Sequence, residues 1–198
     1  MPNNPAFVLG NGRSRMAIEC SLLTEPGTVY GCNAVYREFN PDYLIAVDTK
    51  MVNEIASTGY QDKNQVWTNP NKGIIDKKNI HFFSPHKGWS SGPTALWFAA
   101  HNGHPTIYII GFDFQGIDGK FNNVYADSFN YKNSNDAATY YGNWVNQTQR
   151  IIEEFKHVKF IRVVEDAGFH PEIFANLKNL NTVSYNEFCG IFPTISRK

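Results

Sequence analysis

Short apolar runs of strand length alternate along the chain with stretches of helical period, and this alternation constrains the fold more than any other feature. Several runs are nearly continuous in Val, Ile, Leu, Phe and Tyr, which is typical of strands that are covered on both faces. Strands that alternate with helices predict βαβ units and a mostly parallel sheet. The chain is therefore predicted to be an α/β protein, Rossmann-like and doubly wound, with helices on both faces of the sheet.

The elements follow from these runs and from their flanking turn residues. The predicted strands are Ala6–Gly10, Thr28–Gly31, Tyr43–Asp48, Gln65–Thr68, Asn79–Phe83, Thr106–Gly111 and Val158–Val163. The predicted helices are Ser14–Leu23, Lys50–Ser57, Pro93–Asn102 and Asp136–Lys156. We expect one domain over residues 1–198, because this length suffices for a single core. Within it, the aromatic-rich loop 115–135 is predicted to be a lid, and 171–198 a segment that packs on the domain.

Charge and composition limit the partners. Lys plus Arg equals Asp plus Glu at 18 each, so no overall field favours nucleic acid or an anionic membrane surface. No run approaches the roughly 20 apolar residues of a membrane span, and the start of the chain lacks the pattern of a signal peptide. The three cysteines, Cys20, Cys32 and Cys189, match no zinc spacing and are predicted to be free thiols. We expect a soluble cytoplasmic protein that binds no nucleic acid; an oligomer is compatible with the sequence.

The turn after the first predicted strand, "GNGRSR", combines two glycines with two arginines. Gly10 and Gly12 would let the backbone approach a ligand closely, Asn11 lies between them, and Arg13 and Arg15 could bind a phosphate through charge-assisted hydrogen bonds. The turn lacks the third glycine of G-x-G-x-x-G and the G-K-[ST] of a Walker loop. It therefore predicts either a phosphate site or a tight turn with solvated arginines.

Two polar residues follow the next strands. Asn33 could cap a helical turn or present its amide to a base or a sugar. Asp48 could read a ribose hydroxyl, hold a metal, or cap the helix that begins near Lys50. Because ligands of open parallel sheets bind at the carboxyl ends of the strands, both residues are candidates for a ligand site.

The stretch "SPHKGWSSGPTALWF" leads into a long apolar helix. Ser91 and Gly92 would lie at its N-terminus, where unpaired backbone amides favour an anion. His86 is the histidine considered for acid–base work, because its neutral pKa suits proton transfer, although a loop histidine is often only solvated.

The last candidates lie after the strand "TIYIIGFDF". Asp113 follows a buried run, and the loop brings Tyr125 to the same rim, where its hydroxyl could clamp a phosphate or only pack the loop. The sequence holds no G-x-S-x-G elbow and no H-E-x-x-H motif.

Five segments in order carry a resemblance to a known family. They are "VLGNGRSR", "GCNAVYREFNPDYLIAVD", "SSGPTALWFAAHNGHPTIYIIGFDF", "NNVYAD", and "YYGNW" followed by "IIEEF". In this order they resemble the bacterial lipooligosaccharide sialyltransferases, over residues 6–163. The 6-hydroxymethylpterin diphosphokinase-like proteins share a similar opening.

The resemblance implies a Rossmann-like domain that uses CMP-sialic acid and needs no metal or other cofactor. It implies that Asn11 and its glycines contact the nucleotide phosphate and ribose, and that Asn33 holds the nucleotide or the donor sugar. Ser91 and Gly92 would line the nucleotide pocket through their backbone. Asp113 would lie near the ribose or the cytosine.

The resemblance also bears on catalysis. It implies that Tyr125 steadies the departing phosphate. Asn143, in "YYGNW", occupies the position at which the sialyltransferases carry a catalytic histidine. Asn cannot take up a proton at neutral pH, so either another base serves, with His86 the best candidate, or no transfer occurs.

The leading prediction is thus a glycosyltransferase-like enzyme that uses a nucleotide-sugar donor, with CMP as the nucleotide. One alternative is a nucleotide-binding or structural accessory protein that kept the fold without the chemistry. The other is a phosphoryl or pyrophosphoryl transferase in which Asp48 and Asp113 hold Mg²⁺.

Overall fold

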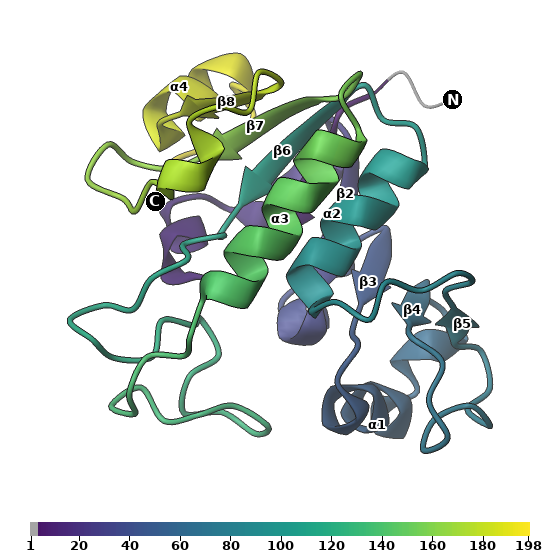
Figure 1. Cartoon of the computed structure of the whole chain (residues 1–198). Coiled ribbons are helices and arrows are strands. Elements are labelled where there is room, and N and C mark those ends of the chain that lie inside the picture. The colour runs from purple at the N-terminus through teal and green to yellow at the C-terminus, as the bar shows by residue number, and fades with distance from the viewer. Residues whose placement is uncertain (1–3) are drawn as a thin grey trace.

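The computed structural model describes residues 4–198 and contains one eight-stranded sheet in which all neighbouring strands are parallel (Figure 1). Residues 1–3 of the predicted domain lie outside the described residues. The spatial order of the strands is β5-β4-β3-β2-β1-β6-β7-β8. The predicted α/β, Rossmann-like and doubly wound fold is confirmed.

The strands are β1 (Ala6–Leu9), β2 (Thr28–Cys32), β3 (Tyr43–Ile45), β4 (Val66–Thr68), β5 (His81–Phe82), β6 (Thr106–Ile110), β7 (Lys159–Val163) and β8 (Leu180–Val183). The α-helices are α1 (Thr49–Thr58), α2 (Ser91–His101), α3 (Gly142–Glu154) and α4 (Tyr185–Ile191). Five 3₁₀-helices complete the fold: η1 (Arg13–Ala17), η2 (Cys20–Thr24), η3 (Asn33–Arg37), η4 (Tyr60–Asp62) and η5 (Glu172–Phe174).

The structure differs from the predicted elements in three places. The predicted helix 14–23 is two 3₁₀-helices, because Ile18 is extended and bridges to Arg197 near the C-terminus. The predicted helix 136–156 begins only at Gly142, since the preceding residues belong to the long loop after β6. The segment 171–198 adds an edge strand, β8, and α4, which begins with a capping box at Ser184.

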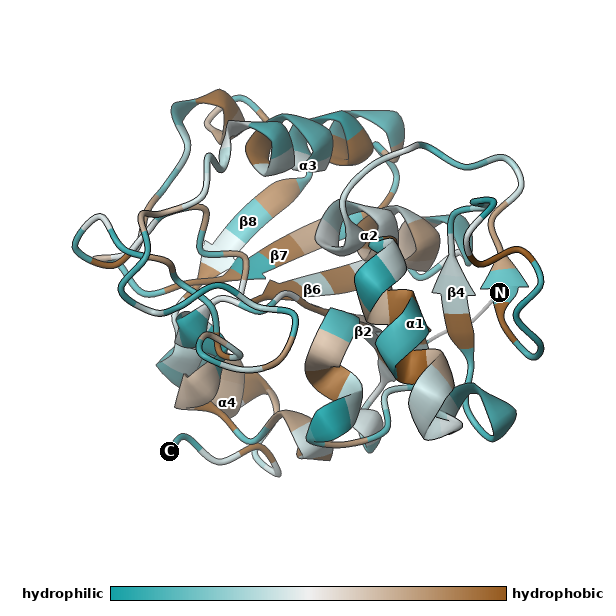
Figure 2. Cartoon of the chain, turned by 90° about the horizontal axis from the view of Figure 1, so that it is seen from below, coloured by the Kyte–Doolittle hydropathy of each residue, from teal (hydrophilic) through white to brown (hydrophobic). Residues whose placement is uncertain are grey.

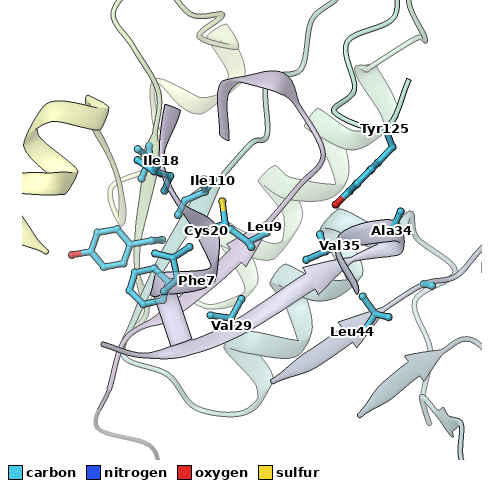
Figure 3. Packing of buried hydrophobic residues seen from close by; sticks show 14 of the residues in the cluster. Phe7, Leu9, Ile18, Cys20, Val29, Ala34, Val35, Leu44, Ile110 and Tyr125 are labelled. Carbon is cyan, nitrogen blue, oxygen red and sulfur yellow. The ribbon is translucent and has the colours of Figure 1, made fainter. Parts of the chain in front are cut away.

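Helices cover both faces of the sheet. On one face, α1, α4 and the first three 3₁₀-helices pack on residues such as Phe7, Leu9 and Val29, shown in Figure 3. On the other face, α2 and α3 lie side by side (Figure 1), and α2 is apolar around its whole circumference. Such a helix is buried on all sides, which fixes it firmly against the sheet.

By contrast, α3 is amphipathic. Its buried residues, Val145, Thr148, Ile151 and Ile152, share one face of the helix. Figure 2 shows the corresponding change from brown to teal around α3. The face that points away from the sheet is polar, so α3 forms the outer surface of this layer.

The strand order reverses between β1 and β6. From β1 the chain builds the sheet in one direction up to β5, then crosses back and places β6 on the other side of β1. The chain segments that follow β1 and β6 therefore run to opposite faces of the sheet, and the carboxyl edge at this point is where open α/β sheets bind ligands. The long loop between β6 and α3 extends past this edge of the sheet (Figure 1).

A buried histidine lies at the opposite edge of the sheet. His104 is 2% exposed; its Nε2 lies 3.0 Å from the Tyr30 hydroxyl and its Nδ1 lies 3.0 Å from the Asn4 carbonyl. The Tyr30 hydroxyl also accepts a hydrogen bond from Asn102, so it donates to an unprotonated Nε2. Burial lowers the pKa of His104 and outweighs the bond to the Asn4 carbonyl, which acts in the opposite direction.

We expect the free energy of unfolding to fall as the pH drops below about 6.5, where the unfolded chain takes up a proton that folded His104 resists. The slope from this residue is at most about 1.4 kcal/mol per pH unit. Urea unfolding between pH 5 and pH 8 measures it. The non-titrating variant His104→Gln should give a flatter profile, and equal slopes in the two proteins would contradict the assignment.

Candidate functional site

A cavity of about 290 Å³ opens at the crevice between β1 and β6. Its wall comes from the turns after β1, β2, β3 and β6, the N-terminus of α2, the long loop and the start of α3. The lining residues are Gly10, Asn11, Gly12, Cys32, Asn33, Val47, Asp48, Ser90, Ser91, Gly92, Pro93, Gly111, Phe112, Asp113, Phe114, Asn122, Asn123, Tyr141 and Trp144. The volume is close to the lower end of the range for small-molecule sites.

The wall contains carboxylates and amides but no cationic side chain. Among the described residues that line the cavity, none is Lys, Arg or His, whereas Asp48 and Asp113 both belong to it. Cys32 also lines it, and burial raises the pKa of its thiol to about 12, so the thiol stays protonated. Aromatic rings, among them Phe112 and Trp144, provide the apolar part of the wall.

The backbone amides of the opening turn already have acceptors inside the protein. The Gly12 amide donates to the Gly111 carbonyl at 2.9 Å, and the Arg13 amide donates to Asn122 Oδ1 at 2.9 Å. The Ser14 amide donates to Asp113 Oδ2 at 3.1 Å, and the Ser14 hydroxyl donates to Asp113 Oδ1. The Asp113 carboxylate thus occupies the place in the turn where the sequence suggested a phosphate.

Gly10 and Gly12 have no room for a side chain because the turn after β6 packs against them. A methyl group at Gly12 would lie 2.5 Å and 2.7 Å from the two Asp113 carboxylate oxygens. A methyl group at Gly10 would lie 2.5 Å from the Gly111 carbonyl oxygen. Gly12 has φ −64°, which any residue adopts, so the requirement for glycine comes from this close approach and not from the backbone conformation.

Two asparagines contribute side chains to the wall of the cavity. Asn11 donates from Nδ2 to the Cys32 carbonyl at 3.3 Å and to the Tyr131 hydroxyl at 3.4 Å, while its buried Oδ1 has no partner in residues 4–198. Asn33 has a left-handed backbone, φ 54°, which Asn tolerates better than most residues. Its Oδ1 accepts a hydrogen bond from the Ser91 hydroxyl at 2.8 Å.

The N-terminus of α2 closes another side of the cavity. The Ser90 amide donates to Gln147 Oε1 at 3.1 Å, and Pro93 has no amide hydrogen. First-turn amides find no acceptor within their own helix, which leaves those of Ser91 and Gly92 at the cavity wall. A methyl group at Gly92 would lie 3.2 Å from the Phe112 ring, so this glycine also serves a close contact.

Asp48 caps α1: its Oδ1 accepts from the Lys50 amide at 3.1 Å. The capping alternative is therefore confirmed; Asp48 also lies in the cavity wall, where contact with a ligand stays a prediction. Eight of the predicted binding residues line the cavity: Gly10, Asn11, Gly12, Asn33, Asp48, Ser91, Gly92 and Asp113.

Arg15 does not line the cavity. It is 2% exposed and pairs with Glu38, at 2.6 Å and 3.1 Å, and it donates to the Tyr125 hydroxyl at 2.7 Å. Burial opposes the charged guanidinium, but the bond with Glu38 raises the pKa of Arg15 above its usual value. Arg15 and Tyr125 therefore attach the long loop to the opening turn, because their polar groups are engaged with one another and with Glu38.

Three further predicted residues also lie outside the cavity wall. Arg13, His86 and Asn143 are exposed and are not among the residues that line the cavity. Arg13 enters the site only through its backbone amide, and Asn143 lies on α3 between two lining residues, Tyr141 and Trp144. A helix presents neighbouring residues on different faces, which accounts for the exposure of Asn143.

The sequence reasoning missed several residues of the site. Asn122 donates to Asp113 Oδ2 at 2.9 Å and to the Gln115 carbonyl at 3.0 Å, so it ties the long loop to the turn after β6. Arg162 on β7 is 2% exposed and donates to the Phe112 and Phe169 carbonyls. The signal for Arg162 is a cation that lies between Ile161 and Val163 in the buried part of the strand "KFIRV".

Within residues 4–198, no three His, Cys, Asp or Glu side chains gather closely enough to hold a metal ion. In the same part of the chain, none of the helices has both the length and the apolar character needed to cross a membrane.

Comparison with known proteins gives one match. No protein-family model and no curated protein matches the sequence. Among solved structures, the chain is similar to the crystal structure of the sialyltransferase CST-II, a tyrosine-to-phenylalanine variant in complex with CMP. The identity is 16%, the TM-score is 0.49, and the alignment covers 96% of this chain and 98% of that chain. This likeness assigns neither a family nor a ligand to the chain.

The contact between Gly12 and Asp113 can be tested by a double-mutant cycle. We expect Gly12→Ala to cost about 1–3 kcal/mol of unfolding free energy, the usual cost of overpacking a tight site. In the background of Asp113→Ala the added methyl has room, so the same substitution should cost far less. Denaturant unfolding of the four proteins gives the coupling, and purely additive effects would contradict this explanation.

Proposed function

We propose that the chain binds a nucleotide sugar in the cavity between β1 and β6 and acts as a glycosyltransferase-like protein. The observation that carries the proposal is the cavity itself: it lies at the point where strand order reverses, and its wall includes the N-terminus of α2 and Asn11, whose buried Oδ1 has no partner in residues 4–198. The sequence resemblance to CMP-sialic acid-dependent transferases supports CMP as the nucleotide.

The wall suits a ligand with many hydroxyl groups and one anionic group. Asn11 Oδ1 is a buried acceptor without a partner, and leaving such a group unpaired costs free energy. A ribose or sugar hydroxyl, or the amino group of a base, would donate to it. Asp48 adds a carboxylate acceptor, and the Phe112 and Trp144 side chains provide apolar surface for a ring.

The phosphate of the ligand would lie at the N-terminus of α2. The amides of Ser91 and Gly92 are available there, and the positive end of the helix dipole favours an anion. α2 is buried on all sides, so these donors are held in place before the ligand binds. Fixed donors stabilise charge on a leaving phosphate without reorganisation, which is the contribution that they would make to transfer.

A non-catalytic nucleotide-binding role is the second candidate, and the composition of the wall favours it. His86 and Asn143 lie outside the wall, and the titratable lining residues are Asp48, Asp113, Cys32 and Tyr141. Burial raises the pKa of both the Cys32 thiol and the Tyr141 hydroxyl, which keeps them protonated. Asp48 is thus the lining group with a free oxygen for proton transfer.

A Mg²⁺-dependent transferase, in which Asp48 and Asp113 would hold the metal ion, fits these two carboxylates less well. Both oxygens of Asp113 already accept hydrogen bonds from Ser14 or Asn122, so this carboxylate would have to give up those bonds to coordinate a cation. Adding EDTA separates the candidates, because only metal-dependent transfer should stop.

We expect Asn11→Ala and Asn33→Ala each to weaken the binding of CMP by about 3- to 10-fold, the range for loss of a neutral hydrogen bond. Isothermal titration calorimetry and thermal shift measure the affinity, first for wild type against CMP, UDP and ADP. The matched control is Asn146→Ala, on the exposed face of α3, which should leave the affinity unchanged.

The outcomes separate the candidates. CMP binding together with release of sugar from CMP-sialic acid supports transfer, whereas CMP binding without turnover supports the non-catalytic role. If wild type binds none of the nucleotides, or if all three asparagine variants behave alike, the proposed site is wrong.

A further inference from the structure

The Asp113 carboxylate lies at the wall of the cavity but faces the protein. Three donors converge on it: the Ser14 amide, the Ser14 hydroxyl and the Asn122 side-chain amide. These donors come from the turn after β1 and from the long loop, whereas Asp113 itself follows β6. One carboxylate therefore joins the three segments that shape the mouth of the crevice.

The network extends behind the cavity. The Tyr185 hydroxyl of α4 donates to Ser14 Oγ at 3.2 Å, and Ser14 Oγ donates in turn to Asp113. Tyr185 is fully buried, so this relay connects the C-terminal helix to the site. The backbone just before Asp113 is also held, since the Phe112 carbonyl accepts two hydrogen bonds from Arg162.

Arg162 provides the countercharge. It is buried without a carboxylate in direct contact, its guanidinium lies 5.1 Å from the centre of the Phe114 ring, and burial lowers its pKa to about 10. The negative charge of Asp113 acts in the opposite direction and favours the charged form of Arg162. The negative charge of Asp113 in the wall thus partly compensates the buried guanidinium behind it.

We propose that Asp113 is a positioning residue that also sets the charge limit of the cavity. Its carboxylate is the anion that the opening turn binds. The Ser14 amide, the Ser14 hydroxyl and the Asn122 side chain already donate to it and are not available to a ligand phosphate. A second phosphate would meet the Asp113 charge in a wall that carries no cationic side chain among its described residues. The site therefore accepts a nucleoside monophosphate and disfavours the diphosphate. The preference for a monophosphate rests on the proposed function, whereas the role of Asp113 as the anion of the opening turn is independent of it.

The first test asks whether the donors of the turn need an anion. Asp113→Ala removes it, and we expect the melting temperature to fall by about 5 °C. Sodium formate, compared with sodium chloride at equal ionic strength, should restore at least about 2 °C to Asp113→Ala and leave wild type unchanged. Asp48→Asn is the matched control, because it removes a cavity carboxylate that does not bind the turn; formate should not affect it. Equal formate effects in all three proteins would overturn the proposal.

The second test measures selectivity with Asp113→Asn, which keeps the side-chain shape and removes the charge. Calorimetry should show that wild type prefers CMP over CDP by about tenfold or more and that Asp113→Asn loses most of this preference. An unchanged preference, or an equal loss in Asp48→Asn, would show that the position of Asp113 is not decisive and would overturn the charge limit.

The two tests fail in different ways. If wild type binds no nucleotide, the proposed function is wrong and the charge limit falls with it, while the formate response still decides whether Asp113 is the anion of the turn. If Asp113→Ala does not fold, the melting temperature of Asp113→Asn decides: the amide cannot replace the negative charge, so a lower melting temperature than wild type is expected, and equal stability would overturn the positioning role.

Discussion

The architecture of the crevice depends on the close contact between two turns. The turn after β1 and the turn after β6 touch through Gly10, Gly12 and the Asp113 carboxylate, and a single methyl group at either glycine would have no room. This contact lies at the place where the sheet changes direction, so it fixes how far the two halves separate. The width of the cavity and the orientation of its donors follow from it.

The fold was predictable because its signals are local. Continuous apolar runs gave the buried strands, and helical period gave α1, α2 and the body of α3. Two features escaped for physical reasons. Ile18 interrupts a helical pattern because it bridges to Arg197, a contact across most of the chain. The edge strand β8 carries the exposed residues Asn181 and Thr182, so its hydrophobic signal is weak.

The site was predictable in position but only partly in role. Residues after strands could be placed at one edge, because parallel strands end together, and Asn11, Asn33 and Asp48 do line the cavity. The sequence could not show that Asp113 would take the donors of the opening turn, since that depends on the contact between turns about 100 residues apart. Nor could it show that Arg15 would be buried against Glu38, because a basic residue in a glycine-rich turn looks like a phosphate ligand.

The central position of β1 has a consequence for how the protein is made. β1 is synthesised before the other strands of this sheet, yet one of its edges pairs with β6, which begins about 100 residues later. Until then that edge has unpaired backbone groups, and long-range parallel pairing of this kind forms slowly. The cavity between β1 and β6 lies on this late seam, so it can form only when the two halves of the sheet have joined. The cavity is therefore a product of the pairing between β1 and β6 and not of either half of the sheet alone.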